Sequence, residues 1–116
     1  MLENLKTYLS DYVSKRVPGF LSLLNVICTT RYGKDCLSLF FESPSRLYLV
    51  FLAYYRGDAL SADYAFTIAV LSPIALLARD PGLAGKLLEL VKLGRDPDFL
   101  DLLTKLSDPR SSRLKH

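Results

Sequence analysis

Residues 64–78 read YAFTIAVLSPIALLA, which is fifteen consecutive positions without a charged side chain. A membrane span needs about 20 consecutive apolar residues. We therefore expect a helix buried in the core of a soluble domain, and no membrane span. Ser61 is a good N-cap, so this helix should extend over residues 62–79. Pro73 lies inside it and should kink the helix or split it in two.

The sequence that follows this run predicts two more helices. Arg79-Asp80-Pro81 and Arg95-Asp96-Pro97 each place an acidic residue directly before a proline. Aspartate caps helix N-termini, and proline is tolerated at the first helical position. We therefore expect helices at about residues 81–93 and 97–106, with Asp96 as the N-cap of the second.

The sequence that precedes the run is divided by turn residues. Apolar residues at three- and four-residue steps predict an amphipathic helix over residues 2–16. Pro18-Gly19 should end it, because proline cannot continue a helix and glycine adopts the left-handed cap conformation. Residues 20–30 are apolar on nearly all sides, so we expect a buried helix there. A polar turn should follow at residues 31–35.

The stretch 36–51 leaves two structures open. It could form a short β-hairpin that turns at Ser43-Pro44-Ser45. We prefer a helix that begins at Ser43, because serine caps a helix well and the proline then takes its first position. The predicted fold is therefore all-α, a compact bundle of five to seven short helices. It should form one domain over residues 1–109, with a disordered basic tail at 110–116.

We expect a cytoplasmic domain, and its composition indicates that it exposes apolar surface. The 116 residues are 50% hydrophobic, and the mean hydropathy is +0.20. A domain this small has much surface to cover with polar groups, so part of its apolar surface should meet another protein chain. The first residues lack the pattern of a secretory leader. The chain has no glutamine and only two asparagines, a tendency of thermophile proteins.

The charge distribution supports nucleic-acid binding as an alternative function. Residues 1–57 carry seven basic and four acidic side chains, a net of +3, whereas residues 58–106 carry five and seven, a net of −2. The tail 107–116 carries three basic and one acidic, a net of +2. Cations can contact phosphates while aromatic rings stack on bases. The candidate contacts are Tyr12, Lys15, Arg16, Arg31, Tyr32 and Lys34.

Catalytic motifs are missing from the sequence. Nucleophilic catalysis by serine or cysteine needs a nearby base, and the one histidine is the terminal His116. Cys28 and Cys36 are too few to hold zinc. We favour free buried thiols for them. A disulfide is the alternative, suited to an oxidising compartment or a hyperthermophile.

One acidic cluster could in principle bind a metal, at Asp96, Asp98 and Asp101. Each carboxylate also has a structural explanation. Asp96 would cap the helix, Asp98 would favour its positive end, and Asp101 would pair with Lys105 four residues on. We therefore predict no catalytic residue, no cofactor and no metal site, and we do not expect an enzyme.

Self-association is the favoured role of the apolar surface. The segments 20–30, 47–55 and 64–78 carry apolar residues on more than one face, and a small domain has one core in which to bury them. Most soluble oligomers are symmetric homo-oligomers. We therefore expect a non-enzymatic interaction or assembly module that binds a second copy or another protein. The interface predicted from its aromatic residues is Tyr48, Phe51, Tyr54 and Tyr55.

A series of turn and helix-start residues runs through the first half: Arg31-Tyr32-Gly33, Phe40, Ser43 to Tyr48, and Tyr54 to Asp58. Their order resembles small helical modules of archaeal proteins, the Nitrosopumilus-type output domains. In both, a Tyr-Gly turn, a proline-led helix and a glycine-bounded turn follow one another. The resemblance implies a helical interaction or output module, and no functional residue is carried over from it. The bundle is also similar in fold class to small helical subunits of CRISPR effector complexes, which line a nucleic-acid channel.

Overall fold

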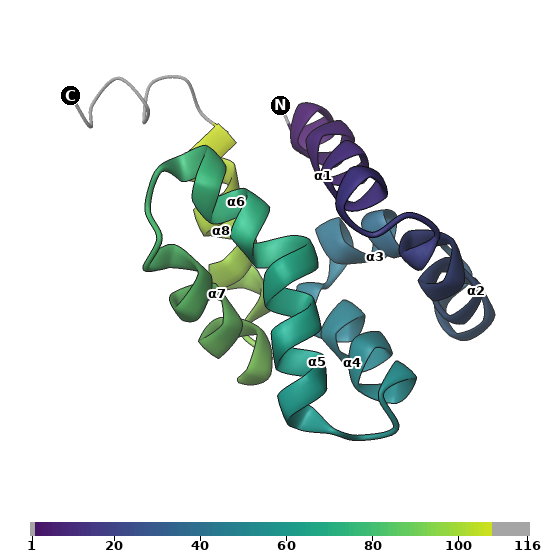
Figure 1. Ribbon diagram of the computed structural model, residues 1–116. Helices are drawn as coiled ribbons and strands as arrows, with labels where there is room; N and C mark the ends of the chain where they lie inside the picture. The colour runs from purple at the N-terminus through teal and green to yellow at the C-terminus, as the bar shows by residue number, and fades with distance from the viewer. Residues whose placement is uncertain (1, 108–116) are drawn as a thin grey trace.

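The computed structural model describes residues 2–107. These residues form seven helices joined by turns (Figure 1), with the continuous helical stretch Ala59–Ala78 counted as one helix. The predicted all-α fold is confirmed. The alternative β-hairpin is wrong, because residues 36–51 fold into two helices. The predicted tail at 110–116 lies outside the described residues. The elements are α1 (Leu2–Arg16), α2 (Phe20–Tyr32), α3 (Cys36–Glu42), α4 (Pro44–Tyr54), α5 (Ala59–Phe66), the π-helical turn η1 (Thr67–Leu71), α6 (Ser72–Ala78), α7 (Leu83–Lys92) and α8 (Asp96–Ser107).

Two helix boundaries follow from local chemistry: the predicted start of α4 at Ser43, and the end of α2, which lies two residues beyond the predicted residue 30. Ser43 has an extended backbone and precedes Pro44 at the first position of α4, and its hydroxyl accepts a hydrogen bond from the Arg46 amide at 3.4 Å. Gly33 ends α2 with a φ of 73°, a left-handed conformation that glycine adopts without a steric penalty. Both signals act within one helical turn, so the sequence alone reveals them.

Two predicted helix starts were misplaced. The N-cap of α5 is Asp58 and not Ser61: the Asp58 carboxylate accepts hydrogen bonds from the Ser61 amide at 3.4 Å and from the Ser61 hydroxyl at 2.8 Å. The helix therefore begins at Ala59. Asp80 accepts a hydrogen bond from the Gly82 amide at 3.1 Å, which holds a turn, and α7 begins only at Leu83.

Pro73 neither ends nor splits the helix in which it lies. The chain stays helical from Ala59 to Ala78, with one π-helical turn, η1, directly before Ser72 and Pro73. In η1 the Ser72 amide bonds to the Thr67 carbonyl, five residues back instead of four. Proline lacks the amide hydrogen and crowds the preceding turn. A wider turn at this point is one way for a helix to continue past a proline.

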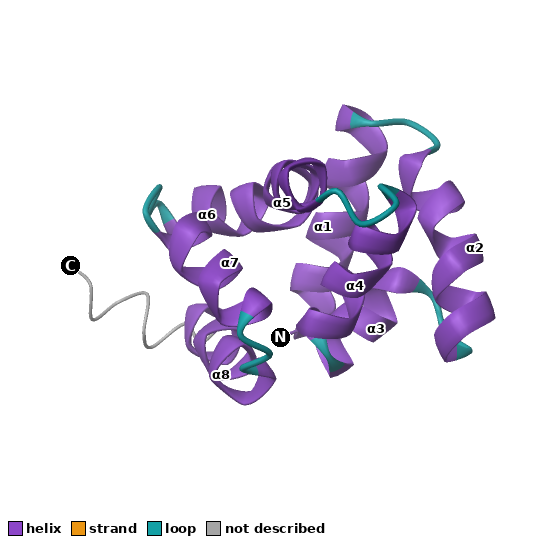
Figure 2. Ribbon diagram, turned by 90° about the horizontal axis from the view of Figure 1, so that it is seen from below, coloured by secondary structure: helices purple, strands orange, loops and turns teal. Residues whose placement is uncertain are grey.

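The core contains phenylalanine side chains from α3, α4, α5 and α8. Phe40 and Phe99 pack edge to face with ring centroids 5.5 Å apart, and Phe51 and Phe66 do the same at 5.1 Å. All four side chains are at most 2% exposed. The α5–η1–α6 helix covers this core between α4 and α7, and no other helix passes in front of it in Figure 1. In Figure 2 the N-terminal part of this helix is seen nearly end-on.

Candidate interaction site on the long helix

Five residues of the α5–η1–α6 helix form its outer side, and we call them the long-helix face: Leu60, Tyr64, Ile68, Ser72 and Leu76. Leu60 is 83% exposed, Tyr64 72% and Leu76 63%, while Ile68 and Ser72 are half-buried. None of the five carries a charge. A soluble chain rarely leaves three large apolar side chains this exposed along one helix, so the face is a candidate site for a partner.

The π-helical turn is what aligns these five residues. They are spaced at four-residue intervals, and each such step drifts by about 40° around a regular α-helix. Four steps would separate Leu60 from Leu76 by about 160°, on nearly opposite sides. The extra residue accommodated in η1 turns the later part of the helix back by about 100°. The half-buried Ile68 and Ser72 therefore link the two exposed ends of one face.

The expectation that residues 64–78 form a buried core helix is only partly right. In the most apolar window of Ala59–Ala78, with a mean hydropathy of 1.6, 44% of the residues are buried. Within residues 2–107, this helix is the one whose length and composition would allow it to cross a membrane. Its buried side packs on the phenylalanine core, and Leu76 and Leu77 point outward.

Both ends of the long-helix face carry charged side chains. Arg56 and Asp58 precede the helix, and Arg79 and Asp80 follow it. All four residues are exposed. At the second end the chain turns toward α7 and borders an open groove of about 440 Å³. The groove is lined by Ser72, Ala75, Leu76, Arg79, Asp80, Pro81 and Ala84.

Arg79 has a strained backbone, and its replacement by glycine should stabilise the protein. Its φ of 56° lies in the left-handed region, where residues other than glycine are disfavoured by about 1–2 kcal/mol. Because glycine loses more entropy on folding, we expect Arg79→Gly to raise the free energy of unfolding by about 0.5–1 kcal/mol. Urea unfolding measures this. Arg79→Ala removes the same side chain but keeps the strain, so an equal gain in both variants would contradict the explanation.

Most residues of the aromatic interface predicted on and directly after α4 do not lie on the surface. Tyr48 and Phe51 are 6% and 2% exposed and belong to the core. Tyr54 is 39% exposed, and its ring packs edge to face on Phe20 at 5.8 Å. Tyr55 is half-buried. Periodicity could not tell which side of this all-apolar helix faces inward.

The buried Tyr48 belongs to a polar cluster that links α4, α5 and α7. Its hydroxyl donates a hydrogen bond to the Asp63 carboxylate, which also accepts one from the Lys92 ammonium at 2.7 Å. Burial, together with the hydrogen bond to Asp63 and its negative charge, raises the pKa of Tyr48 to about 12. Burial alone would raise the pKa of Asp63, but the hydrogen bonds from Lys92 and Tyr48 hold it below its usual value. We interpret the cluster as a structural tie between three helices.

The predicted nucleic-acid contacts lie in two separate groups. Tyr12, Lys15 and Arg16 lie on the last two turns of α1, where the Arg16 guanidinium lies 5.3 Å from the centre of the Tyr12 ring. The second group, Arg31, Tyr32 and Lys34, lies at the far end of α2.

The surface between the two groups is not basic. The thirteen residues of α2 span about 20 Å, and within this helix Arg31 in the last turn is the only cation. The exposed Leu23 and Val26 lie along the way. Lys34 is paired with Glu42, and the Arg46 guanidinium lies 6.0 Å from the Tyr32 ring. The two groups therefore do not form one continuous basic track.

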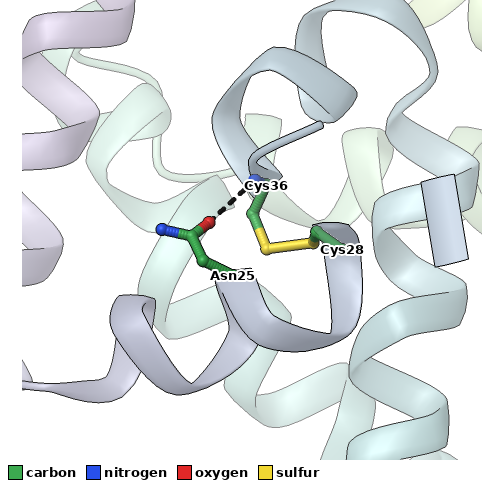
Figure 3. The surroundings of a disulfide bond; sticks show 3 residues. All are labelled: Asn25, Cys28 and Cys36. Atoms are coloured by element: carbon green, nitrogen blue, oxygen red, sulfur yellow. Dashed lines mark hydrogen bonds between the residues drawn. A yellow bond between two sulfur atoms is a disulfide. The ribbon is translucent and has the colours of Figure 1, made fainter. Parts of the chain in front are cut away.

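Cys28 and Cys36 form a disulfide, so the expectation of free thiols was wrong (Figure 3). Their Cα atoms are 5.4 Å apart, because the turn after α2 brings the start of α3 back beside it. Asn25, one turn before Cys28, accepts a hydrogen bond from the Cys36 amide at 2.8 Å (Figure 3). A covalent bond and a side-chain cap thus join α2 to the N-terminus of α3.

The Asp96 carboxylate caps α4 and not its own helix. It accepts hydrogen bonds from the Ser43 hydroxyl at 2.5 Å, the Ser45 amide at 2.9 Å and the Ser45 hydroxyl at 2.9 Å. Its own helix starts with the bond from the Phe99 amide to the Arg95 carbonyl, so Arg95 takes the N-cap position. The predicted pair of Asp101 and Lys105 is present at 3.1 Å.

Residues 2–107 contain no group of three or more histidine, cysteine, aspartate or glutamate side chains placed to hold a metal ion. Comparison with known proteins finds no matching family model, curated protein or solved structure. The resemblance to archaeal output modules therefore gains no support, and any function must be argued from the surface of this chain.

Proposed function

We propose that the chain is a non-enzymatic protein–protein interaction or assembly module and that the long-helix face is its binding surface. The observation that carries this proposal is the exposure of three large apolar side chains along one helix, Leu60, Tyr64 and Leu76. Burying them removes apolar area from water, which favours association by about 25 cal/mol per Å². Tyrosine is also enriched at interface cores, where the ring is buried and the hydroxyl can reach the rim.

Site-specific photo-cross-linking in the producing cell tests the proposal. A benzophenone amino acid in place of Tyr64, which is 72% exposed, should give a covalent adduct with a protein. Tyr54 provides a matched control because it is also a tyrosine, is 39% exposed, and packs against Phe20 of α2 outside the long-helix face. Adducts from position 54 with none from position 64 would contradict the proposal. The mass of the adduct would identify the type of partner.

Nucleic-acid binding stays the alternative, with a distinct prediction. A nucleic-acid-binding module should shift single-stranded or duplex oligonucleotides in a salt-dependent manner, because bound cations displace counterions from the phosphates. Neutral substitutions of Arg16 and Arg31 should then weaken binding together. The two cationic groups are separated by the uncharged part of α2, and this favours the protein-binding proposal.

The cellular location stays a proposal as well. The sequence led us to expect a cytoplasmic location, but paired cysteines are uncommon in the reducing cytoplasm of mesophiles. A disulfide between Cys28 and Cys36 therefore favours an oxidising compartment or a hyperthermophilic host.

A further inference from the structure

We infer that the partner of the long-helix face is a second copy of this chain, packed antiparallel about a two-fold axis that passes next to Ile68. The inference rests on the proposed function and adds the identity, orientation and register of the partner. In a two-fold interface each patch must complement itself, so residue i of one copy meets residue j of the other and the reverse. The sequence of this face meets that condition.

The face is symmetric about its midpoint. Ile68 is the third of its five residues, so antiparallel packing places Ile68 against its own copy. The same register places Leu60 against Leu76 of the second copy, leucine on leucine at both ends. Tyr64 then lies against Ser72, a large side chain opposite a small one. This pairing fills space without overlap between the two tyrosines.

The charges at the two ends are complementary in the same register. Asp58 precedes the helix and Arg79 follows it, so antiparallel packing brings each carboxylate near a guanidinium of the other copy. Arg56 and Asp80 are related in the same way. In a parallel pair, Asp58 would instead lie near its own copy, as would Arg79, and the oppositely charged neighbours Arg56 and Asp80 would offset part of this repulsion.

The dimensions of the face set the expected affinity. A helix of 20 residues is about 30 Å long and about 10 Å wide, which offers about 300 Å² per copy before its flanks are counted. The two copies together would bury about 600 Å² plus the flanks, which is less than the roughly 1,200 Å² of stable specific interfaces, so the association should be weak. We therefore expect a dissociation constant of about 1–100 µM.

Sedimentation equilibrium over about 5–500 µM tests the dimer, since that range brackets the expected constant. Wild type should pass from a mass of 13.0 kDa to twice that mass. Leu76→Asp should stay a monomer with an unchanged helical spectrum. Leu23→Asp is the matched control, because Leu23 on α2 is 57% exposed, close to the 63% of Leu76. This variant should dimerise like wild type.

Arg79→Gly should weaken the dimer by about two- to thirtyfold, because two exposed ion pairs are lost.

Disulfide trapping tests the register. Ile68→Cys should form a covalent dimer on mild oxidation, whereas Leu60→Cys alone should not. A mixture of Leu60→Cys and Leu76→Cys should form a covalent heterodimer. The native Cys28 and Cys36 are bonded to each other and buried, so they do not compete.

Three results would overturn the inference. The first is a monomer of 13.0 kDa at every concentration. If the photo-adduct of position 64 then contains a different protein, the proposed function survives and only the second copy is wrong. The second is trapping of Leu60→Cys with itself, which would mean parallel packing. The third is a monomer that floats with phosphatidylcholine–phosphatidylglycerol vesicles through the same face, which would make the partner a membrane surface.

Discussion

Asp96→Ala should lower the free energy of unfolding by about 2–4 kcal/mol. Hydrogen bonds to a charged group contribute about 1.5–3 kcal/mol each, and new partners for the donors should recover part of the loss. The carboxylate bonds to the Ser45 amide and to the hydroxyls of Ser43 and Ser45. Ser43 is 6% exposed, so water cannot readily replace the lost acceptor. The two serine oxygens lie 3.4 Å apart and can satisfy each other in part, which limits the loss.

Two controls separate this explanation from an ordinary charge effect. Asp98 lies in the same turn of α8, its side chain is 50% exposed, and it pairs with Arg95. Asp98→Ala should cost at most about 1 kcal/mol, the range for an exposed pair at a helix end. Asp96→Asn keeps an acceptor oxygen without the charge and should fall between the two alanine variants. Equal losses at positions 96 and 98 in urea unfolding would show that Asp96 does not join α4 to α8.

Asp96 also illustrates where inference from sequence stops. The rule that an acid before a proline caps the following helix uses only neighbouring residues, and it gave α8 nearly its correct start. The actual partners of the carboxylate are 51 and 53 positions away in the sequence. Such a contact depends on how α4 and α8 pack, which no local pattern encodes. The Ser43 cap of α4 was predicted because its hydrogen bond spans only three residues.

The candidate site was missed for a related reason. The charge-free run 64–78 identified the central helix, but hydrophobicity alone does not say which side of an apolar helix is buried. Tyr48 and Phe51 were expected outside and lie in the core, whereas Leu60 and Leu76 are on the surface. The four-residue spacing from Leu60 to Leu76 was visible in the sequence. It becomes one face only through the π-helical turn, whose presence Pro73 did not by itself predict.

Loss of the Cys28–Cys36 bond should lower the free energy of unfolding by about 2–3 kcal/mol, because the bond closes a loop of nine residues and restricts the unfolded chain. The bond also holds the start of α3 beside α2, where Asn25 caps it. Urea unfolding of Cys28→Ala/Cys36→Ala beside wild type measures the loss. Adding Asn25→Ala should lower the free energy of unfolding by a further amount of about 0.5–2 kcal/mol.

Both cysteines are at most 1% exposed, so a reductant should act on the folded protein only after local opening. Because the two sulfurs are bonded to each other, wild type unfolded without reductant should contain no titratable thiol. After unfolding in reductant, it should refold with the lower urea midpoint of the double variant. Two titratable thiols in protein purified without reductant, together with a midpoint that reductant does not change, would show that the cysteines are unpaired and that α3 is held in place by packing alone.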